Sequence, residues 1–137
     1  ANAANEKNIK NYMVVTFDLN NLKMCNDNYG HSSGDAYIIH SAHIIETTFD
    51  RFGKCYRIGG DEFCCLIPDA AEFQIERFIQ KMQQDIAILN NKNIIPTEVG
   101  IACGYALATP DDADIEKVRE RADEMMYHNK KVLKGLI

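Results

Sequence analysis

Three acidic residues of this chain stand where a folded sheet would hold them close together. Asp18 ends a run of β-branched and aromatic residues, 12–18, that predicts a buried strand. Asp61 and Glu62 lie between two short β-rich runs that predict a hairpin with a tight turn. If the first strand and the hairpin are neighbours, the three carboxylates converge near one point.

Convergent carboxylates have a recognisable chemical use. They repel one another unless a cation joins them, and hard oxygen ligands select Mg²⁺ or Mn²⁺. Mg²⁺ keeps part of its coordination shell for substrate phosphates, so such a site is suited to phosphoryl transfer. The alternative is that an acidic turn is simply solvated. Composition alone favours that alternative, and the motifs around the acids reverse the preference.

The apolar pattern of the chain predicts the elements that must position these acids. Segment 20–29 is polar and indicates a short helix or loop, and apolar residues at helical spacing predict a helix within 35–49. The further expected elements are strands at 54–58, 62–67 and 97–108, and helices at 73–89 and from 115 onward. This order predicts an α/β (α+β) sandwich with a mixed or mostly antiparallel sheet.

Length and charge limit the classes of function. The chain has 137 residues, the size of one domain, and its formal net charge of -5 argues against a nucleic-acid partner. No apolar run approaches the roughly 20 residues that cross a bilayer, and we expect no membrane contact by this domain. Residues 1–8 are interpreted as a tag or disordered linker, which leaves 9–137 as the single domain.

The cysteines and histidines give little sign of a metal site. Five cysteines, an odd number without a CxxC pair, argue against a disulfide framework and a structural zinc site. We therefore expect small buried thiols in a reducing cytoplasm. His40 and His43 have a spacing that suits a metal on a helix, but no third ligand lies nearby in the sequence.

Three motifs place the acids in a wider pattern. The segment Arg57–Phe63 reads Arg-Ile-Gly-Gly-Asp-Glu-Phe and contains GGDEF unchanged. Phe17–Asp35 is similar to FDxDxFKxxNDxxGHxxGD, and Ala122–Lys130 is similar to ADxALYxAK. Five residues could recur by chance, whereas three motifs in this order should not. The chain therefore resembles the GGDEF domain of the diguanylate cyclase family over about residues 12–135.

The resemblance implies a fold like the palm of adenylyl cyclases and polymerases. Its expected centre is a mostly antiparallel five-stranded sheet with flanking helices and an active-site β-hairpin. The family's opening segment, which carries a DxLTGLxNR motif, is absent, so we expect a domain without its usual N-terminal helix. A sensory or dimerisation domain is expected upstream in a longer protein. The GGDEF-like domain is expected in the cytoplasm, either in a cytoplasmic protein or as the cytoplasmic domain of a membrane-anchored sensor.

The resemblance also implies a metal and catalytic set. Asp18 would bind Mg²⁺ or Mn²⁺ with help from the backbone carbonyl of Leu19. Asp61 and Glu62 would bind metal and assist removal of the proton from an attacking 3′-hydroxyl group. Which of these two acids performs which task stays open.

The same resemblance implies a GTP-binding set. Asn26 and Asp35 would contact the guanine edge, where an acceptor at O6 and donors at N1 and N2 match an amide and a carboxylate. Lys23 and Lys130 would contact the triphosphate as point charges. Lys134 lies where a further basic residue usually sits, and a surface role is an equal alternative for it.

Gly59 and Gly60 complete the substrate set that the resemblance implies. Glycine has no Cβ, so the turn could approach the nucleotide closely and adopt a positive φ.

The implied function is the condensation of two GTP into the second messenger cyclic di-GMP, with release of pyrophosphate, between two antiparallel copies of the domain. One departure weakens the match: the family usually has aspartate where this chain has Asn20. The alternative is a catalytically weak regulatory module of a multidomain signalling protein that binds GTP or cyclic di-GMP. A plain interaction domain with accidental motifs is a third and weaker interpretation.

Overall fold

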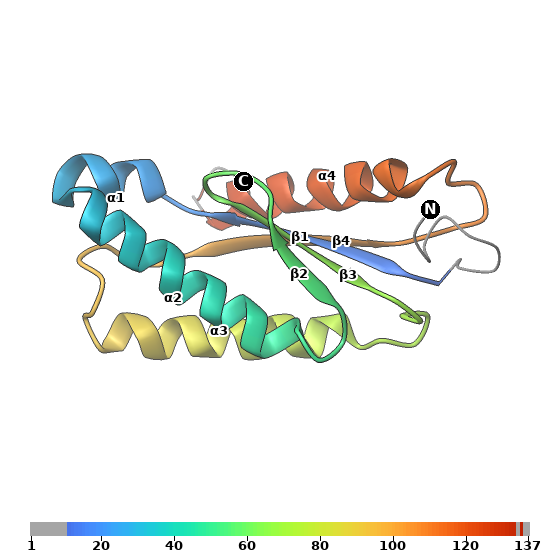
Figure 1. The fold of residues 1–137 in the computed structure, drawn as a ribbon, viewed down its shortest axis with the longest axis horizontal. Helices are drawn as coiled ribbons and strands as arrows, with labels where there is room; N and C mark the ends of the chain where they lie inside the picture. Colours follow the sequence, from blue (N-terminus) through green and yellow to red (C-terminus); the bar gives the residue numbers. More distant parts are fainter. Residues whose placement is uncertain (1–10, 134, 136–137) are drawn as a thin grey trace.

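The structure is a computed structural model that describes residues 11–133 and residue 135 (Figure 1). The predicted tag or linker at 1–8 and the candidate phosphate contact Lys134 lie outside the described residues. The chain runs strand, two helices, two strands, helix, strand, helix. This is the order that the apolar pattern predicts.

One antiparallel sheet forms the middle layer. Its strands are β1 (Met13–Leu19), β2 (Lys54–Arg57), β3 (Glu62–Ile67) and β4 (Ile101–Leu107), and they lie in the order β2-β3-β1-β4. The expected number of five strands is wrong for the described residues, which form four. Each of the four β-rich runs between residues 11 and 133 forms one strand, and the segments between them form helices or loops.

Helices cover both faces of the sheet. They are α1 (Leu22–Tyr29), α2 (His31–Phe49), α3 (Ile75–Asn91) and α4 (Ile115–Leu133). Figure 1 shows α2 and α3 on one side of the sheet and α4 on the other. Helix α2 begins earlier than expected. Gly30, at a φ of 92°, is the residue that interrupts the helical conformation between α1 and α2.

The core is divided by the sheet into two layers. The larger layer joins β1 and β3 to α2 and α3 and contains Phe17, Ile45 and Met82, while the smaller one joins β1 and β4 to α4 and contains Val14 and Val118. Side chains alternate between the two faces along a strand. The even-numbered residues of β1, Asp18 among them, therefore face α4.

Close contact between α4 and β4 fixes the height of α4 above the sheet. A Cβ atom at Gly104 would lie 2.2 Å from the Ala122 carbonyl oxygen and 2.3 Å from the Met126 backbone nitrogen. The two backbones therefore approach more closely than any larger residue allows. This contact sets where the last two turns of α4, including Lys130, lie relative to β1.

Among residues 11–133 and 135, no helix combines the length and the apolar character needed to cross a membrane.

Candidate active site

The register of β1 and β3 brings the acids together as the sequence predicted. The Leu19 N–H donates to the Asp61 carbonyl at 2.9 Å, and Asp18 is the partner of Glu62. Hydrogen-bonded and non-hydrogen-bonded pairs alternate in an antiparallel ladder, so Asp18 and Glu62 form a non-hydrogen-bonded pair. Side chains are closest at such pairs, with Cβ atoms about 4.5–5.5 Å apart. Both carboxylates thus leave the same face of the sheet, side by side.

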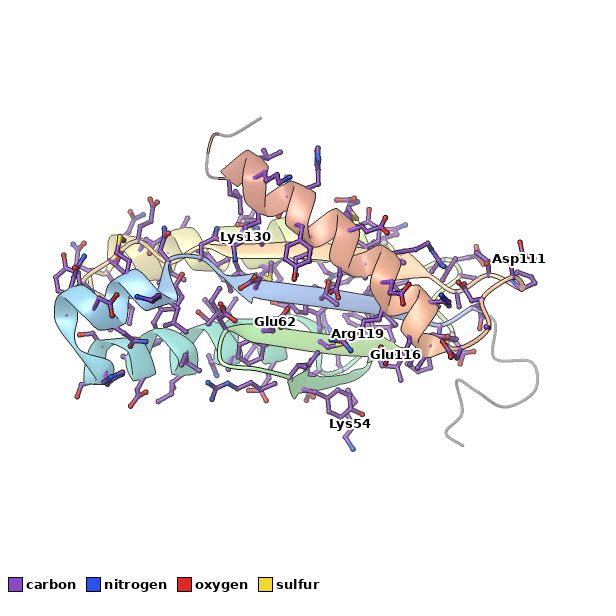
Figure 2. The ribbon with its side chains drawn as sticks, turned by 90° about the horizontal axis from the view of Figure 1, so that it is seen from above. Lys54, Glu62, Asp111, Glu116, Arg119 and Lys130 are labelled. Atoms are coloured by element: carbon purple, nitrogen blue, oxygen red, sulfur yellow. The ribbon has the colours of Figure 1, made fainter. Side chains whose placement is uncertain are left out.

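Asp18 is the buried centre of this group. The residue is only 5% exposed, its Oδ2 accepts a hydrogen bond from the Lys130 ammonium at 2.8 Å, and its Oδ1 is buried with no hydrogen-bond partner among the described residues. Burial raises the pKa of Asp18, the Lys130 ammonium opposes that shift, and the nearby Asp61 carboxylate adds to it. Figure 2 shows Lys130 and Glu62 on the two sides of the same end of β1.

Glu62 lies in a field of several acids and one base. Its pKa is raised by burial, by Asp18, by Asp123 and by Asp61, and it is lowered by Arg119. The sequence reasoning missed Arg119 and Asp123, which come from α4. Their spacing was the available signal: Asp123 lies four residues after Arg119 and seven before Lys130, and residues at such spacings share one face of a helix.

Arg57 holds the turn that carries Asp61 and Glu62. Its Nε donates to the Gly59 carbonyl at 3.0 Å, and its Nη2 donates to the Gly60 carbonyl at 2.9 Å. The expectation of positive φ at these glycines is wrong, because neither is among the positive-φ glycines. The strands stop at Arg57 and resume at Glu62, so the turn is longer than a tight two-residue turn and needs no left-handed residue.

The space around these glycines remains open. A Cβ atom at Gly60 would meet nothing within 4 Å among the described residues, and one at Gly59 would meet only the Glu62 Oε1, at 3.7 Å. The open side of the turn leaves room for a ligand to approach the backbone.

The candidate guanine contacts lie at the junction of α1 and α2. Asn26 is half-buried on α1 and Asp35 is exposed on α2. A Cβ atom at Gly34 would lie 1.6 Å from the Asn26 Oδ1, so the Asn26 side chain occupies space that only glycine leaves free. Sequence reasoning missed Gly34, although a glycine inside a predicted helix is a signal of close packing.

The candidate phosphate contacts are placed differently from one another. Lys130 reaches Asp18, whereas the Lys23 side chain is 89% exposed and pairs with Asp27 at 2.7 Å. Among the described residues, no hydrogen bond or ion pair joins Lys23, Asn26 or Asp35 to the acids of the hairpin. The structure therefore brings together the acids and Lys130, and it leaves the α1–α2 residues as a separate group.

Tyr37 is a further residue whose role sequence reasoning missed. Its side chain is fully buried, its hydroxyl oxygen accepts from the Gly100 N–H at 3.0 Å, and its O–H is close to the carbonyl oxygens of Asn20 and Gly100. Burial raises the pKa of Tyr37 to about 12, so the hydroxyl group stays neutral. Tyr37 joins the end of β1 to the start of β4 and so fixes the strand that ends in Asp18.

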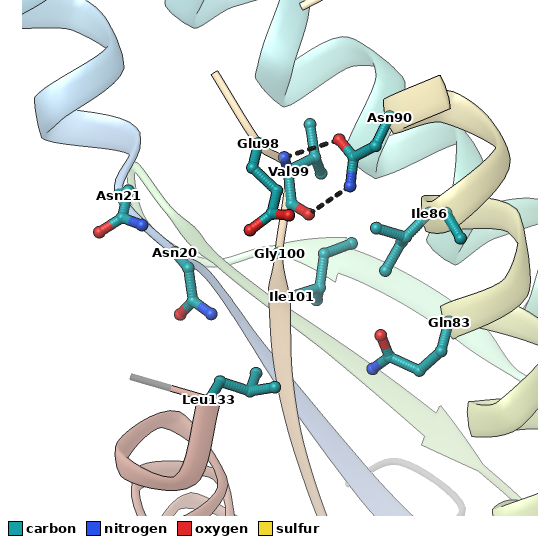
Figure 3. Close-up of a pocket in the computed structure, with 11 residues that line it drawn as sticks. Asn20, Asn21, Gln83, Ile86, Asn90, Glu98, Val99, Gly100, Ile101 and Leu133 are labelled. Carbon is teal, nitrogen blue, oxygen red and sulfur yellow. Dashed lines mark hydrogen bonds between the residues drawn. The ribbon is translucent and has the colours of Figure 1, made fainter. Parts of the chain in front are cut away.

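A cavity of about 480 Å³ lies beside this corner, between the end of β1, the start of β4 and α3 (Figure 3). Amide side chains line much of it, and Asn90 closes one wall by bonding to both the N–H and the carbonyl of Val99. Asn20 lies two residues after Asp18 and so connects the cavity to the acidic corner. It is 7% exposed, lines the cavity, and has a buried Oδ1 without a hydrogen-bond partner in the described part of the chain.

The donor chemistry of the acidic corner fits a hard divalent cation. A desolvated carboxylate oxygen such as the Asp18 Oδ1 costs free energy until a cation or donor meets it. Within the described residues, no three His, Cys, Asp or Glu side chains are already arranged around one ion position. The side chains of Asp61 and Glu62, which are half-exposed, would have to turn toward Asp18 to complete such a site.

Comparison of the sequence with protein families gives a match over nearly the whole chain. The family described as "Diguanylate cyclase, GGDEF domain" matches residues 1–134. Diguanylate cyclase DgcN of Escherichia coli is 31% identical over 123 residues, which are 88% of this chain and 30% of that protein. The uncharacterized membrane protein SSP1970 of Staphylococcus saprophyticus is 30% identical over 126 residues, which are 89% of this chain and 35% of that protein. The chain thus spans about a third of the length of these relatives.

Solved structures show the same fold. The GGDEF domain of DgcB from Caulobacter crescentus, in complex with c-di-GMP, superposes with a TM-score of 0.77 at 23% identity, covering 88% of this chain and 72% of that one. An EAL/GGDEF domain protein from M. capsulatus superposes with a TM-score of 0.75 at 26% identity, covering 94% and 84%. These likenesses confirm the predicted cyclase palm-like fold. The chain belongs to the GGDEF domain family of diguanylate cyclases.

Proposed function

We propose that this domain is a diguanylate cyclase, which condenses two GTP into cyclic di-GMP and releases pyrophosphate. The observation that carries the proposal is the acidic corner, where Asp18 and Glu62 are register partners and Asp61 lies beside Asp18. Asp18, Asp61 and Glu62 of the family's motifs are retained in it, while Asn20 replaces a further aspartate. Relatives named as diguanylate cyclases, DgcN and DgcP of Escherichia coli, support the same reaction.

Four groups would hold the divalent cation of this reaction, Mg²⁺ or Mn²⁺. They are the carboxylates of Asp18, Asp61 and Glu62 and the backbone carbonyl of Leu19. A cation bound there supplies charge neutralisation of the substrate phosphates. The buried Oδ1 of Asp18 supports this assignment, because it is an acceptor without a donor in the described residues.

Glu62 is our candidate for the group that takes the proton from the attacking 3′-hydroxyl. Burial and the neighbouring acids raise its pKa, which makes its carboxylate a better proton acceptor than an ordinary glutamate. Asp61 precedes it in the turn and would then act mainly on the cation. In this proposal Glu62 accepts the proton and Asp61 binds the cation, a division that the sequence leaves open.

The substrate would lie across the two groups of residues. Asn26 and Asp35 would bind the guanine edge, and the open backbone at Gly59 and Gly60 would let the nucleotide approach the turn. Lys130 pairs with Asp18 in the free domain, and it would move to the triphosphate when a cation replaces it on Asp18. Lys23 is exposed and would have to leave its ion pair with Asp27 to reach the triphosphate, while Lys134 lies outside the described residues.

Two antiparallel copies of the domain would form the complete reaction site. Each linkage of cyclic di-GMP requires the 3′-hydroxyl of one GTP to attack the α-phosphorus of another. One domain of this kind holds one GTP, so a second copy must present the other nucleotide. In the full-length protein an upstream sensory or dimerisation domain would control this pairing, with the cyclase domain in the cytoplasm.

The substitution Glu62→Gln tests the proposal. It keeps the shape of the side chain and removes its ability to accept a proton, so formation of cyclic di-GMP from GTP and Mg²⁺ should fall by about 10²–10⁴-fold. The denaturation midpoint should stay unchanged. Glu124→Gln, at an exposed glutamate of α4 that forms none of the ion pairs found among the described residues, is the matched control and should keep full activity. Retention of activity in Glu62→Gln would remove the role of the acidic corner.

Asn20 favours a second candidate function. A neutral amide stands where the family usually has an aspartate, and it is buried two residues after Asp18. The lower negative charge weakens cation binding and is compatible with a catalytically weak module that binds GTP or cyclic di-GMP and regulates a partner domain. Saturable GTP binding by calorimetry without any cyclic di-GMP formation would favour this function over the cyclase.

A further inference from the structure

Two cysteines face each other across the stem of the signature hairpin. Cys55 on β2 is the register partner of Cys65 on β3, and their sulfur atoms are 3.5 Å apart. Both thiols are free. Their side chains lie on the face of the sheet that is covered by α2 and α3, where they pack against the larger core layer.

The backbone at this pair matches what a disulfide requires. The Ile58 N–H donates to the Glu62 carbonyl at 2.9 Å, so Ile58 and Glu62 are a hydrogen-bonded pair. Counting back along the ladder, the Cys55–Cys65 pair is a non-hydrogen-bonded one, where Cα atoms lie about 4.5 Å apart. Disulfides span Cα separations of about 4.4–6.8 Å. The bond can therefore form by a small movement of the two sulfur atoms.

The two thiols have unequal access and unequal acidity. Cys55 is partly exposed, whereas Cys65 is fully buried. The hydrogen bond that Cys55 shares with Cys65 lowers the pKa of Cys55 against the opposing effects of burial and of Asp50 and Glu46. The same hydrogen bond and burial raise the pKa of Cys65. Cys55 is therefore the thiol that meets an oxidant first, and Cys65 is placed to react with it next.

The other cysteines are excluded from this pair by their positions. Cys64 lies next to Cys65 in the sequence, but its side chain points to the opposite face and packs against the smaller core layer. Cys25 lies on α1, and Cys103 lies on β4 opposite Phe17. Only Cys65 has its sulfur within bonding reach of Cys55 in the described part of the chain.

We propose that Cys55 and Cys65 are a peroxide-oxidisable pair whose disulfide clamps the hairpin that carries Asp61 and Glu62. The Cys55 thiolate attacks one oxygen of hydrogen peroxide, which breaks the O–O bond and leaves a sulfenic acid and, after protonation, one water. The Cys65 sulfur then attacks the Cys55 sulfur and displaces hydroxide, which takes the Cys65 proton and leaves as a second water. The two thiols lose two electrons and two protons, and one peroxide is reduced to two waters.

The clamp would act on the least supported strand of the sheet. β2 is an edge strand of four residues that pairs only with β3, and three of its four residues are exposed. A covalent bond between its second residue and β3 prevents the local opening by which such edges exchange their amide protons. The redox site does not depend on the proposed cyclase activity, so either proposal can fail without the other.

Peptide mapping after oxidation tests the pair directly. The chain is treated with hydrogen peroxide, the remaining thiols are alkylated, and the protein is cut with trypsin, which cleaves after Lys54, Arg57 and Arg77. The expected product is peptide 55–57 joined to peptide 58–77, with a mass lower by two hydrogen atoms than the sum of peptide 55–57 and peptide 58–77 alkylated at Cys64. Dithiothreitol should release both peptides.

Matched serine variants identify the partner sulfur. Cys64→Ser should keep the linked peptide, while Cys65→Ser and Cys55→Ser should lose it. The linked peptide is sought first in the wild-type protein, so the test can still be made if Cys65→Ser folds poorly. Recovery of both wild-type peptides unlinked, with Cys55 free or singly oxidised, overturns the proposal, and so does a link that survives in Cys65→Ser.

Hydrogen exchange tests the clamp. Exchange of the β2 amides should slow by about tenfold on oxidation of the wild type and should not slow in Cys55→Ser. Equal exchange in the reduced and linked wild-type protein overturns the clamp.

Discussion

The two carboxylate oxygens of Asp18 have different surroundings. One is neutralised by the Lys130 ammonium at 2.8 Å, and the other is buried without a partner in the described residues. Burying a charge is costly unless it is paired, and burial raises the pKa of Asp18 although Lys130 opposes this effect. Lys130 therefore favours the ionised form of Asp18 and opposes the rise in its pKa that burial causes.

The substitution Lys130→Met tests this role of Lys130. It should lower the free energy of unfolding at neutral pH by about 1–3 kcal/mol, less than for a fully buried pair because the Lys130 side chain is 24% exposed. Chemical denaturation of the chain measures the difference. Lys131→Met is the matched control, because Lys131 is exposed and forms none of the ion pairs found among the described residues, and it should leave stability nearly unchanged.

The pH dependence of Lys130→Met has a definite sign. Without Lys130, the folded pKa of Asp18 should rise further above its unfolded value. A raised carboxyl pKa destabilises the fold above that pKa and has no effect below the unfolded pKa, where the group is protonated in both states. The deficit of the variant should thus be largest at neutral pH and shrink as the pH falls toward about 4. If the stability deficit of Lys130→Met stays constant or grows as the pH falls, the loss of stability comes from packing and not from the charge of Lys130.

At the scale of elements, the junction of α1 and α2 is set by two glycines. Gly30 adopts a φ of 92° between the helices, and Gly34 in the first turns of α2 leaves the space that the Asn26 side chain fills. The amide that would bind guanine is thus held against α2 by the absence of a single methyl group. Position and orientation of Asn26 depend on Gly34.

Gly34→Ala should separate ligand binding from stability. Alanine is favoured over glycine in a helix by about 0.5–1 kcal/mol, which offsets part of the cost of moving the flexible Asn26 side chain. Unfolding free energy should therefore change little, while GTP affinity measured by calorimetry should fall about tenfold or more because Asn26 loses its position. In the background of Asn26→Ala the same change should have no further effect on affinity. Additive losses would show that Gly34 acts by another route.

The position of α4 on the sheet depends on its close contact with β4 at Gly104. Gly104→Ala would place a methyl group within 3 Å of the α4 backbone at Ala122 and Met126. Backbone cannot move as a side chain does, so we expect a loss of about 1–3 kcal/mol of unfolding free energy. We also expect weaker pairing of Lys130 with Asp18. Thermal or urea denaturation measures the loss.

Gly60→Ala is the control for Gly104→Ala. A Cβ atom there meets nothing within 4 Å among the described residues, and the backbone is not at a positive φ. Its stability should match the wild type. Equal destabilisation by both changes would show that loss of glycine, and not the contact with α4, is responsible.

At the scale of the whole molecule, one domain presents half of the proposed reaction site. In the proposed reaction the acids, Lys130 and the α1–α2 residues would hold one nucleotide, and the product contains two. The rate of cyclic di-GMP formation should therefore depend on the population of dimers, which falls with dilution by mass action.

Dilution tests this dependence. Below the dissociation constant of the dimer, specific activity per domain should fall about twofold for each twofold dilution. Activity is followed at saturating GTP, with light scattering at the same concentrations to give the oligomeric state. Constant specific activity over about a hundredfold dilution, in a sample that remains monomeric, would contradict a shared site.

Much of the fold and the acidic corner follows from local patterns in the sequence. Runs rich in β-branched and aromatic residues predict the four observed strands, and helical spacing predicts the helices to within a few residues. Once the strand before Asp18 and the hairpin around Asp61 and Glu62 are neighbours, the three acids lie at the same end of the sheet, because an antiparallel register aligns the end of one strand with the start of the other. The family motifs are equally a property of the sequence alone.

The tertiary structure decided what depends on contacts between distant segments. Lys130 reaches Asp18 across 112 residues, Arg119 and Asp123 set the field around Glu62, and Tyr37 joins the ends of two strands. The conformation of the turn glycines and the space left by Gly34 also depend on the tertiary structure. Local propensity reports the conformation of one segment, whereas these features arise from side chains that packing brings together only after the helices settle on the sheet.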